Sequence, residues 1–139
     1  MPNVTDWAGA VPISGVREIV HRIAGRDDIF HLEIGEPNFP TPSHIIEAAA
    51  ESARAGSGYV DSAGVRDLRQ AIRDKLVTAN GFDIETEQVI VTQGGIQGCS
   101  LVFSSLVKPG GEVLIPDPGW PNFEMLALLH GAVPVPYPL

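Results

Sequence analysis

The stretch that decides the fold runs from residue 88 to residue 137 and reads QVIVTQGGIQGCSLVFSSLVKPGGEVLIPDPGWPNFEMLALLHGAVPVPY. Runs rich in β-formers alternate here with segments of helical spacing. Strands are expected at 88–92, 111–117 and 132–137, with helices at 95–107 and from Pro121 to about His130. Connections long enough to hold a helix join parallel strands through right-handed crossovers. The sequence therefore predicts an α/β fold with a parallel sheet.

The residues before this stretch predict mostly helix. An irregular arm is expected over 1–13, helices over 14–24, 43–55 and 65–79, and a short strand over 29–34. Ser14 and Ser43 stand where residues that cap helix N-termini are expected, and Asn80-Gly81 is a typical helix end. The segment GEPNFPTP (35–42) has three prolines in eight residues, which predicts a rigid, extended loop.

Composition limits the classes of function. A chain of 139 residues with 44% hydrophobic residues has room for one domain and enough apolar side chains for a core. The 9 basic and 17 acidic residues give a net charge of −8, which argues against binding to nucleic acid or to an anionic membrane. A phosphate ligand remains possible, because backbone N–H groups bind phosphate without basic side chains.

Residue types also argue against several kinds of site. Cys99 is the only cysteine, so no internal disulfide or cysteine-rich zinc site is expected. The four histidines are scattered, and no metal site is expected. The N-terminal residues lack the pattern of a signal peptide, and no apolar run is long enough to span a membrane. A cytoplasmic location is the expectation.

Two loops are expected at the carboxyl edge of the sheet, where ligands of open α/β folds bind. In the first, Gly94 and Gly95 directly precede a helix. Glycine lets a ligand approach the backbone closely, and the helix N-terminus offers unpaired N–H groups and partial positive charge. This pattern predicts a phosphate cradle, with an ordinary strand-to-helix turn as the alternative.

The second loop, DPGWP (117–121), carries Trp120 between a turn and a proline. An indole there can stack on a flat heteroaromatic ring, or it can be a lid over the core. A dinucleotide site is a weaker hypothesis. Its G-x-G-x-x-G fingerprint matches at Gly95 and Gly98, whereas position 93 is Gln.

Several segments in register resemble the N-terminal part of the class I/II aminotransferases, which are pyridoxal-phosphate enzymes of fold type I. They are IGEPNFPTP (34–42), Tyr59 ahead of AGVRDLRQAI (63–72), VTQGGIQ (91–97), PGGEV (109–113) and PGWPNF (118–123). The resemblance implies an incomplete three-layer fold with a parallel sheet. It further implies an N-terminal arm or small-domain segment over 1–45, and the first part of the large cofactor-binding domain over 46–139.

Carried over residue by residue, the resemblance implies a cofactor site and one substrate contact. The positions are Gly95, Ile96 and Gln97 at the phosphate of pyridoxal 5'-phosphate, Trp120 on its ring, Tyr59 reaching that phosphate across a homodimer, and Gly35 at the substrate carboxylate. Ile96 stands where the family often has a small or polar residue. A contact there is therefore expected through the backbone alone.

The reaction that the resemblance implies is transfer of an amino group between an amino acid and a 2-oxo acid. Neither Lys75 nor Lys108 matches the family's Schiff-base lysine, so no catalytic residue is expected in this chain. That lysine is expected from a C-terminal part, in the same or in a separate chain, and the 139 residues alone are expected to be inactive. The alternatives are a lyase or decarboxylase of the same fold, and a non-catalytic module that binds a phosphate ligand or a partner.

Overall fold

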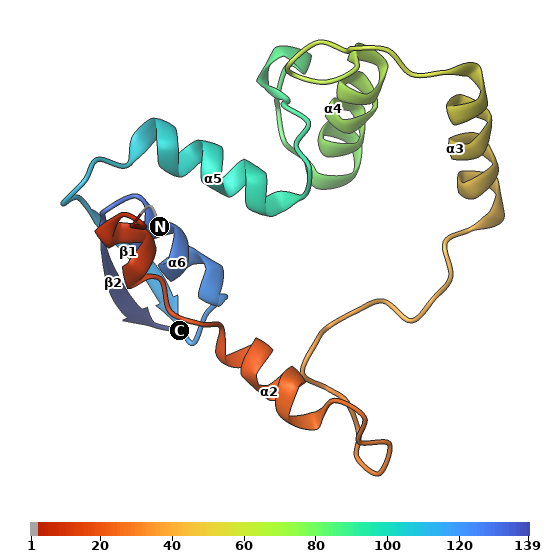
Figure 1. The fold of residues 1–139 in the computed structure, drawn as a ribbon. Coiled ribbons are helices and arrows are strands. Elements are labelled where there is room, and N and C mark those ends of the chain that lie inside the picture. Colours follow the sequence, from red (N-terminus) through yellow and green to blue (C-terminus); the bar gives the residue numbers. More distant parts are fainter. Residues whose placement is uncertain (1–2) are drawn as a thin grey trace. The chain divides into compact units, whose positions relative to one another are not determined.

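The computed structural model describes residues 3–139. Its elements, in chain order, are α1 (Asp6–Ala10), α2 (Gly15–Ile23), α3 (Ser43–Ala55), α4 (Arg66–Asn80), the short 3-10 helix η1 (Thr86–Gln88), α5 (Gly95–Leu106), β1 (Glu112–Asp117), α6 (Pro121–Leu129) and β2 (Val133–Pro138), as Figure 1 shows. The chain forms two compact units. One combines the residues up to Gly35 with 93–139, and the other comprises 36–92.

The first unit contains a parallel pair of strands. β1 and β2 pair in a register that runs from Glu112 opposite Val133 to Asp117 opposite Pro138. The amides of Val133 and Leu139 donate to backbone carbonyls on the β1 side. The three prolines of β2 occupy the alternate positions, whose N–H groups would point away from β1. Proline is therefore tolerated in β2, which is an edge strand.

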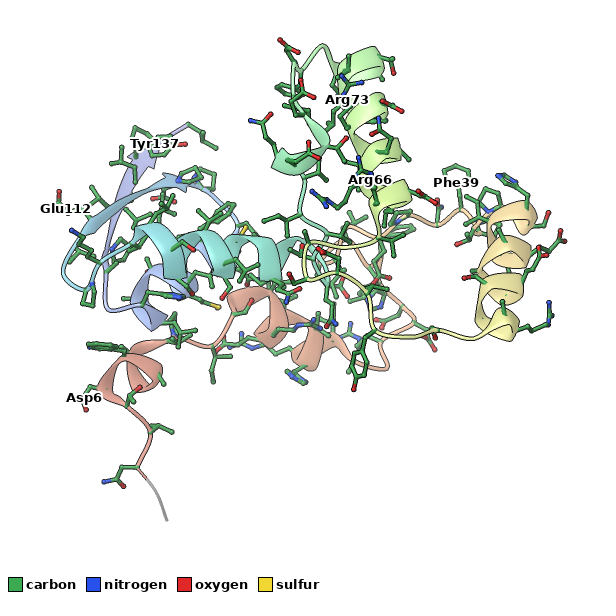
Figure 2. All side chains as sticks on the ribbon, turned by 90° about the horizontal axis from the view of Figure 1, so that it is seen from above. Asp6, Phe39, Arg66, Arg73, Glu112 and Tyr137 are labelled. Atoms are coloured by element: carbon green, nitrogen blue, oxygen red, sulfur yellow. The ribbon has the colours of Figure 1, made fainter. Side chains whose placement is uncertain are left out.

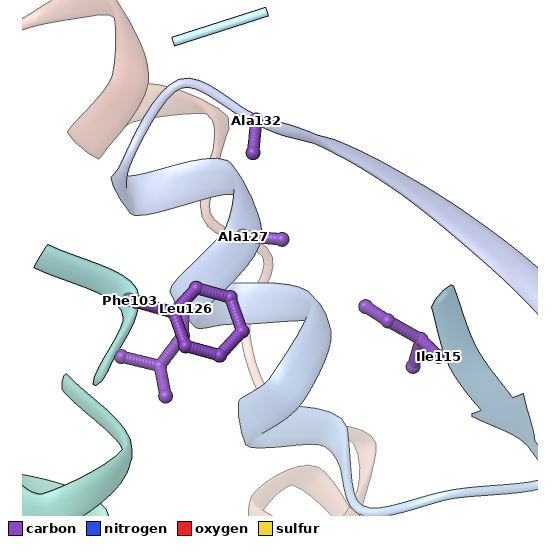
Figure 3. Close-up of a cluster of buried hydrophobic side chains, with 5 residues drawn as sticks. All are labelled: Phe103, Ile115, Leu126, Ala127 and Ala132. Carbon is purple, nitrogen blue, oxygen red and sulfur yellow. The ribbon is translucent and has the colours of Figure 1, made fainter. Parts of the chain in front are cut away.

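A small apolar core lies around α6, the helix that connects β1 to β2. Its buried members come from α5, β1, α6 and the residue just before β2: Phe103, Ile115, Leu126, Ala127 and Ala132. Ala127 points toward Ile115, and the Phe103 ring lies beside Leu126 (Figure 3). Ala127 is fully buried, so any larger side chain there would separate the helix from the sheet.

The N-terminal arm is more ordered than the sequence predicts. α1 is a one-turn helix whose first turn is capped by the Thr5 hydroxyl, which accepts from the Ala8 amide at 3.3 Å. The Trp7 ring lies against Gly131, where a Cβ atom would stand 3.1 Å from the ring. Gly131 has φ +69°, so it both follows α6 in a left-handed conformation and leaves room for Trp7.

In the second unit, α4 holds the segment that follows it. Gly81 ends the helix in the left-handed conformation. The Arg69 guanidinium then donates to the carbonyls of Val89 at 2.8 Å and Thr86 at 2.9 Å. Arg73, labelled in Figure 2, donates to the Ile84 carbonyl at 3.1 Å. Three backbone carbonyls of this segment are thus bonded to one face of α4.

Two predicted strands are wrong. Residues 88–92 form the end of η1 and an extended segment, and no strand pairs with it among residues 3–139. Its backbone forms hydrogen bonds outside any sheet. The Val91 amide donates to the Ala63 carbonyl at 2.9 Å, and the Arg69 guanidinium donates to the Val89 carbonyl. Residues 29–34 are irregular backbone with bends, and Phe30 and Leu32 are exposed.

The α/β class with a parallel sheet is confirmed, and the sheet has two strands where three were predicted. Two predicted caps also need correction. α3 has Pro42 at its cap position, so Ser43 is its first helical residue. Ser14 is the cap residue of α2, but its side chain makes no cap hydrogen bond.

Candidate functional site

The predicted phosphate cradle is the first turn of α5. Gly94 is the cap residue, with φ +78°, a conformation that favours glycine, and Gly95 begins the helix. A Cβ atom built on either glycine would meet nothing within 4 Å, so the space over this backbone is open. The first turn contains no acidic residue. Gly95, Ile96 and Gln97 occupy the positions whose amides have no carbonyl to bond within the helix.

Gln97 stabilises this turn. Its side-chain oxygen accepts a hydrogen bond from the Gln93 amide, four residues earlier, at 2.5 Å. This bond closes the loop over the two glycines in the way a capping box does. The Gln97 side chain therefore helps to shape the turn, and its backbone amide is left for a ligand.

Trp120 lies at the cap position of α6, in the turn that follows β1. Its ring meets Phe123 edge to face, with the ring centroids 5.3 Å apart and the planes at 87°. The residue is 46% exposed, so much of the indole is open. A Cβ atom at Gly119 would collide with the Pro116 carbonyl, so only glycine fits in the turn that sets the direction of Trp120.

The structure brings Trp120 together with Gly35. Both line a hollow of about 430 Å³, although they are far apart in the sequence. The other lining residues come from α2, the segment before Gly35 and the start of α6: Ser14, Val16, Arg17, Glu33, Ile34, Pro121 and Asn122. A second hollow of about 340 Å³, which includes Asp117 and Glu124, also reaches Trp120.

Ile96 lines a different, apolar hollow of about 430 Å³ along α6. Its walls include Ala8 and Val11 of the N-terminal arm, together with Asn122 and Leu126 of α6. Asn122 also lines the hollow of Gly35 and Trp120, so the start of α6 contributes to both.

Tyr59 belongs to the second unit and is fully exposed there. Its loop is anchored two residues later, where the Asp61 carboxylate accepts from the Ala63 amide at 2.8 Å. The predicted role of Tyr59 stays a prediction, as do the roles of the other five predicted positions.

Both lysines are exposed. Lys75 lies on α4 and donates to the Asn80 side chain at 2.6 Å. Lys108 lies in the turn after α5, at the opposite end of that helix from Gly95.

An ionic pair borders the hollow of Gly35 and Trp120. The His31 ring contacts the Glu33 carboxylate at 2.9 Å through Nδ1 and the Arg26 carbonyl at 2.8 Å through Nε2. The bond to Glu33, followed by the bond to the Arg26 backbone, raises the pKa of His31 above its ordinary 6.5. The same pair lowers the pKa of Glu33.

The His31 ring is therefore expected to titrate above pH 6.5 in a proton NMR titration. Because the folded pKa of His31 is raised, the stabilisation from its protonated ring is lost as pH rises from the unfolded value through the folded one. Because the folded pKa of Glu33 is lowered, the pair is also lost at acidic pH, once that carboxylate is protonated. Glu33→Gln should lower the midpoint of the His31 titration, because it removes the carboxylate that holds the proton on the ring. An equal midpoint in both proteins would contradict the pairing.

The sequence analysis identifies neither Arg17 nor Asn122 as a site residue, yet both line the hollow of Gly35 and Trp120. A signal for Arg17 was available. On α2, Arg22 has an acidic partner four residues away in Glu18, at 4.0 Å, whereas Arg17 has no acidic residue three or four positions away. For Asn122 no comparable signal exists.

Among residues 3–139, no group of three or more histidine, cysteine, aspartate or glutamate side chains could hold a metal ion. Over the same residues, no helix has the length and apolar character needed to cross a membrane.

Residues 27–139 match the family model described as aminotransferase class I and II. An aspartate aminotransferase of Pyrococcus horikoshii is 40% identical over 127 residues, which are 91% of this chain and 32% of that protein. The structure matches an aspartate aminotransferase from Rhizobium meliloti with a TM-score of 0.91 at 26% identity, covering 100% of this chain and 36% of that one. It also matches an alanine aminotransferase from Pyrococcus furiosus with a TM-score of 0.87 at 32% identity, covering 98% and 36%.

The chain spans about a third of the length of the curated relatives it matches. The likeness to the solved structures extends over nearly the whole chain, which confirms the expected fold of the fold-type-I pyridoxal-phosphate transferases. The family match covers the glycine turn of α5, the turn of Trp120 and Gly35 together. The chain therefore belongs to the class I and II aminotransferase family.

Proposed function

We propose that this chain takes part in the transfer of an amino group between an amino acid and a 2-oxo acid with pyridoxal 5'-phosphate as cofactor. The observation that carries the proposal is the open glycine turn at the start of α5 in a chain of this family. The relatives that match carry the names of aminotransferases for aspartate, alanine and other amino acids.

The residues present suit this cofactor. The amides of Gly95, Ile96 and Gln97 can bind its phosphate, since helix N-termini favour anions and no Cβ atom blocks the glycines. The Ile96 side chain cannot donate a hydrogen bond, so its contribution is the backbone. The open face of Trp120 suits a flat pyridine ring. When bound, the cofactor supplies the aldehyde and the electron sink of the reaction.

Gly35 is proposed to contact the substrate carboxylate. It lines the same hollow as Trp120, so a substrate at the ring would lie within the walls of that hollow. No Cβ atom built on Gly35 would meet another atom within 4 Å, which leaves its backbone accessible.

The lysine that holds the cofactor covalently is proposed to come from residues outside these 139. Lys75 is bonded to Asn80, and Lys108 stands at the far end of α5. The chain on its own is accordingly proposed to be inactive in amino transfer.

Three further proposals follow the sequence-based predictions. Residues 1–45 serve as an arm or small-domain segment, and 46–139 as the first part of the cofactor-binding domain. The enzyme is a homodimer in which Tyr59, fully exposed here, reaches the cofactor phosphate of the partner subunit. The location is cytoplasmic, where a reducing environment suits the unpaired thiol of Cys99.

Amino transfer is tested by nitrogen labelling in the complete enzyme. Incubation with aspartate or alanine labelled in the amino group, together with an unlabelled 2-oxo acid, is expected to yield labelled product amino acid only when pyridoxal 5'-phosphate is present. Mass spectrometry of the products measures the label. Release of ammonia or carbon dioxide without label in a new amino acid would contradict amino transfer.

The fluorescence of the Trp120 indole tests whether the cofactor ring stacks on it. With Trp7→Phe, Trp120 becomes the only tryptophan of these residues. Its fluorescence should fall as cofactor binds, in step with the appearance of activity. Unchanged Trp120 fluorescence in an active enzyme would contradict the stacking role of Trp120 but not the proposed amino transfer.

A further inference from the structure

Arg17 brings a positive charge into the hollow that holds Gly35 and Trp120. It lies in the first turn of α2 and is exposed. Across residues 3–139, no acidic group lies within ion-pair distance of its guanidinium, although Arg22, Arg26 and Arg73 each have an acidic partner. Arg17 thus has an unused set of donors in a hollow of about 430 Å³.

Among the residues that line this hollow, the acidic one is Glu33, and its carboxylate is already paired with His31. Its carboxylate contacts His31 at 2.9 Å. An ion pair with Arg17 would need a distance within about 4 Å, and none is formed. The charge of Arg17 is therefore not neutralised inside the hollow by Glu33.

The other polar groups of the hollow can also donate hydrogen bonds. The Ser14 hydroxyl makes no cap bond with α2, and Asn122 offers an amide at the start of α6. Ile34, Trp120 and Pro121 add apolar wall. A guanidinium with nearby hydroxyl and amide donors beside an apolar wall suits a carboxylate attached to a small organic group, because arginine binds carboxylates through two parallel bonds.

We propose that Arg17 binds a carboxylate of the amino-acid or 2-oxo-acid substrate. The proposal rests on the proposed function for the identity of the ligand, and it adds a residue of α2 to the substrate site. Two carboxylates could be involved, namely the one that all amino acids share and the side-chain carboxylate of aspartate or glutamate. Both have the same chemistry, and the choice of probes separates them.

The test compares Arg17→Gln with wild type in the complete enzyme. The variant keeps a polar side chain and loses the charge, so KM for the affected substrates should rise about tenfold to a hundredfold, with a smaller change in kcat. Arg17→Lys should recover part of the loss, because lysine restores the charge without the planar fork. If aspartate and alanine are affected equally, the shared carboxylate is bound, and an effect on aspartate alone assigns the side-chain carboxylate.

A binding measurement without turnover accompanies the kinetics. Succinate and propionate are titrated against the Trp7→Phe enzyme, with Trp120 fluorescence as the signal, with and without Arg17→Gln. Arg22→Gln is the matched control, since Arg22 lies on the same helix, pairs with Glu18 and does not line the hollow. Thermal unfolding confirms that both variants fold.

Unchanged KM and unchanged carboxylate affinity in folded Arg17→Gln enzyme would overturn the proposal. So would an equal loss in Arg22→Gln, because it would indicate a general effect of charge on α2. A wild-type enzyme that binds carboxylates through Arg17 but transfers no amino group would contradict the proposed function and leave the binding role in place.

Discussion

Valine in place of Gly95 is expected to weaken binding of pyridoxal 5'-phosphate at least tenfold while the chain stays folded. Gly95 is the first residue of α5, its φ is not positive, and a Cβ atom there meets nothing within 4 Å. The fold therefore tolerates a side chain at this position. A bound phosphate would be excluded, because the branched carbons of valine would occupy the space over the amides of the first turn.

The magnitude follows from the bonds that would be lost. A hydrogen bond to a charged group contributes about 1.5–3 kcal/mol, and about 1.4 kcal/mol corresponds to a factor of ten in affinity. Loss of even one amide–phosphate bond is enough for a tenfold change. The measurement is a cofactor titration followed by absorbance in the complete enzyme.

Ile96→Ala is the matched control for Gly95→Val. The side chain of Ile96 offers no hydrogen bond, so its loss should change cofactor affinity by less than about threefold. Circular dichroism checks that α5 forms in both variants. Tight cofactor binding by folded Gly95→Val enzyme would mean that the phosphate is held elsewhere.

Apart from α1 and η1, which the sequence analysis does not predict, the helices could be predicted from the sequence because each carries its own signals. Pro121 stands at the first position of α6, and Gly81 ends α4 in the left-handed conformation that favours glycine. These signals act over a few residues. The structure places the helix boundaries within about two residues of the prediction, which is the scatter expected of any assignment.

The strands could be predicted only in part, because a strand forms only beside a partner strand, and the local sequence does not determine which segment that is. Segment 111–117 and segment 132–137 have each other as partners, since α6 returns the chain to pair them. Segment 88–92 is richer in β-branched residues than either of these segments, yet its backbone bonds to Arg69 and Ala63. Tertiary bonds therefore decided its conformation over β propensity.

The candidate site could also be predicted only in part from the sequence. The glycine turn at 94–95 and the exposed Trp120 follow from neighbouring residues, and both could be predicted from short motifs. The hollow could not, because it joins Arg17 and Gly35 to Asn122, about a hundred residues later in the chain. Charge and pattern identify candidates for binding, and only the folded chain shows which of them share a cavity.

Alanine in place of Gly64 is expected to lower the free energy of unfolding by about 2–4 kcal/mol, the range of overpacked and strained positions. Gly64 has φ +104°, which side chains rarely adopt, and a Cβ atom there would lie 2.6 Å from Cγ2 of Val91. Beside this contact, the Val91 amide donates to Ala63 at 2.9 Å. The added methyl group must therefore push Val91 away and strain a hydrogen bond that holds the segment before the glycine turn.

Gly58→Ala is the control for this effect, because Gly58 lies in the same loop without a positive φ and with nothing within 4 Å of an added Cβ. Its unfolding midpoint in urea should stay close to that of wild type. The double variant Gly64→Ala with Val91→Ala separates the two causes. Alanine at position 91 removes Cγ2 but keeps its Cβ, which would lie 2.7 Å from the new one, so the double variant should recover only part of the loss. The backbone strain of alanine at φ +104° would remain in both the single and the double variant. A Gly64→Ala protein as stable as the Gly58→Ala protein would show that the close approach of residue 64 to Val91 is absent in solution.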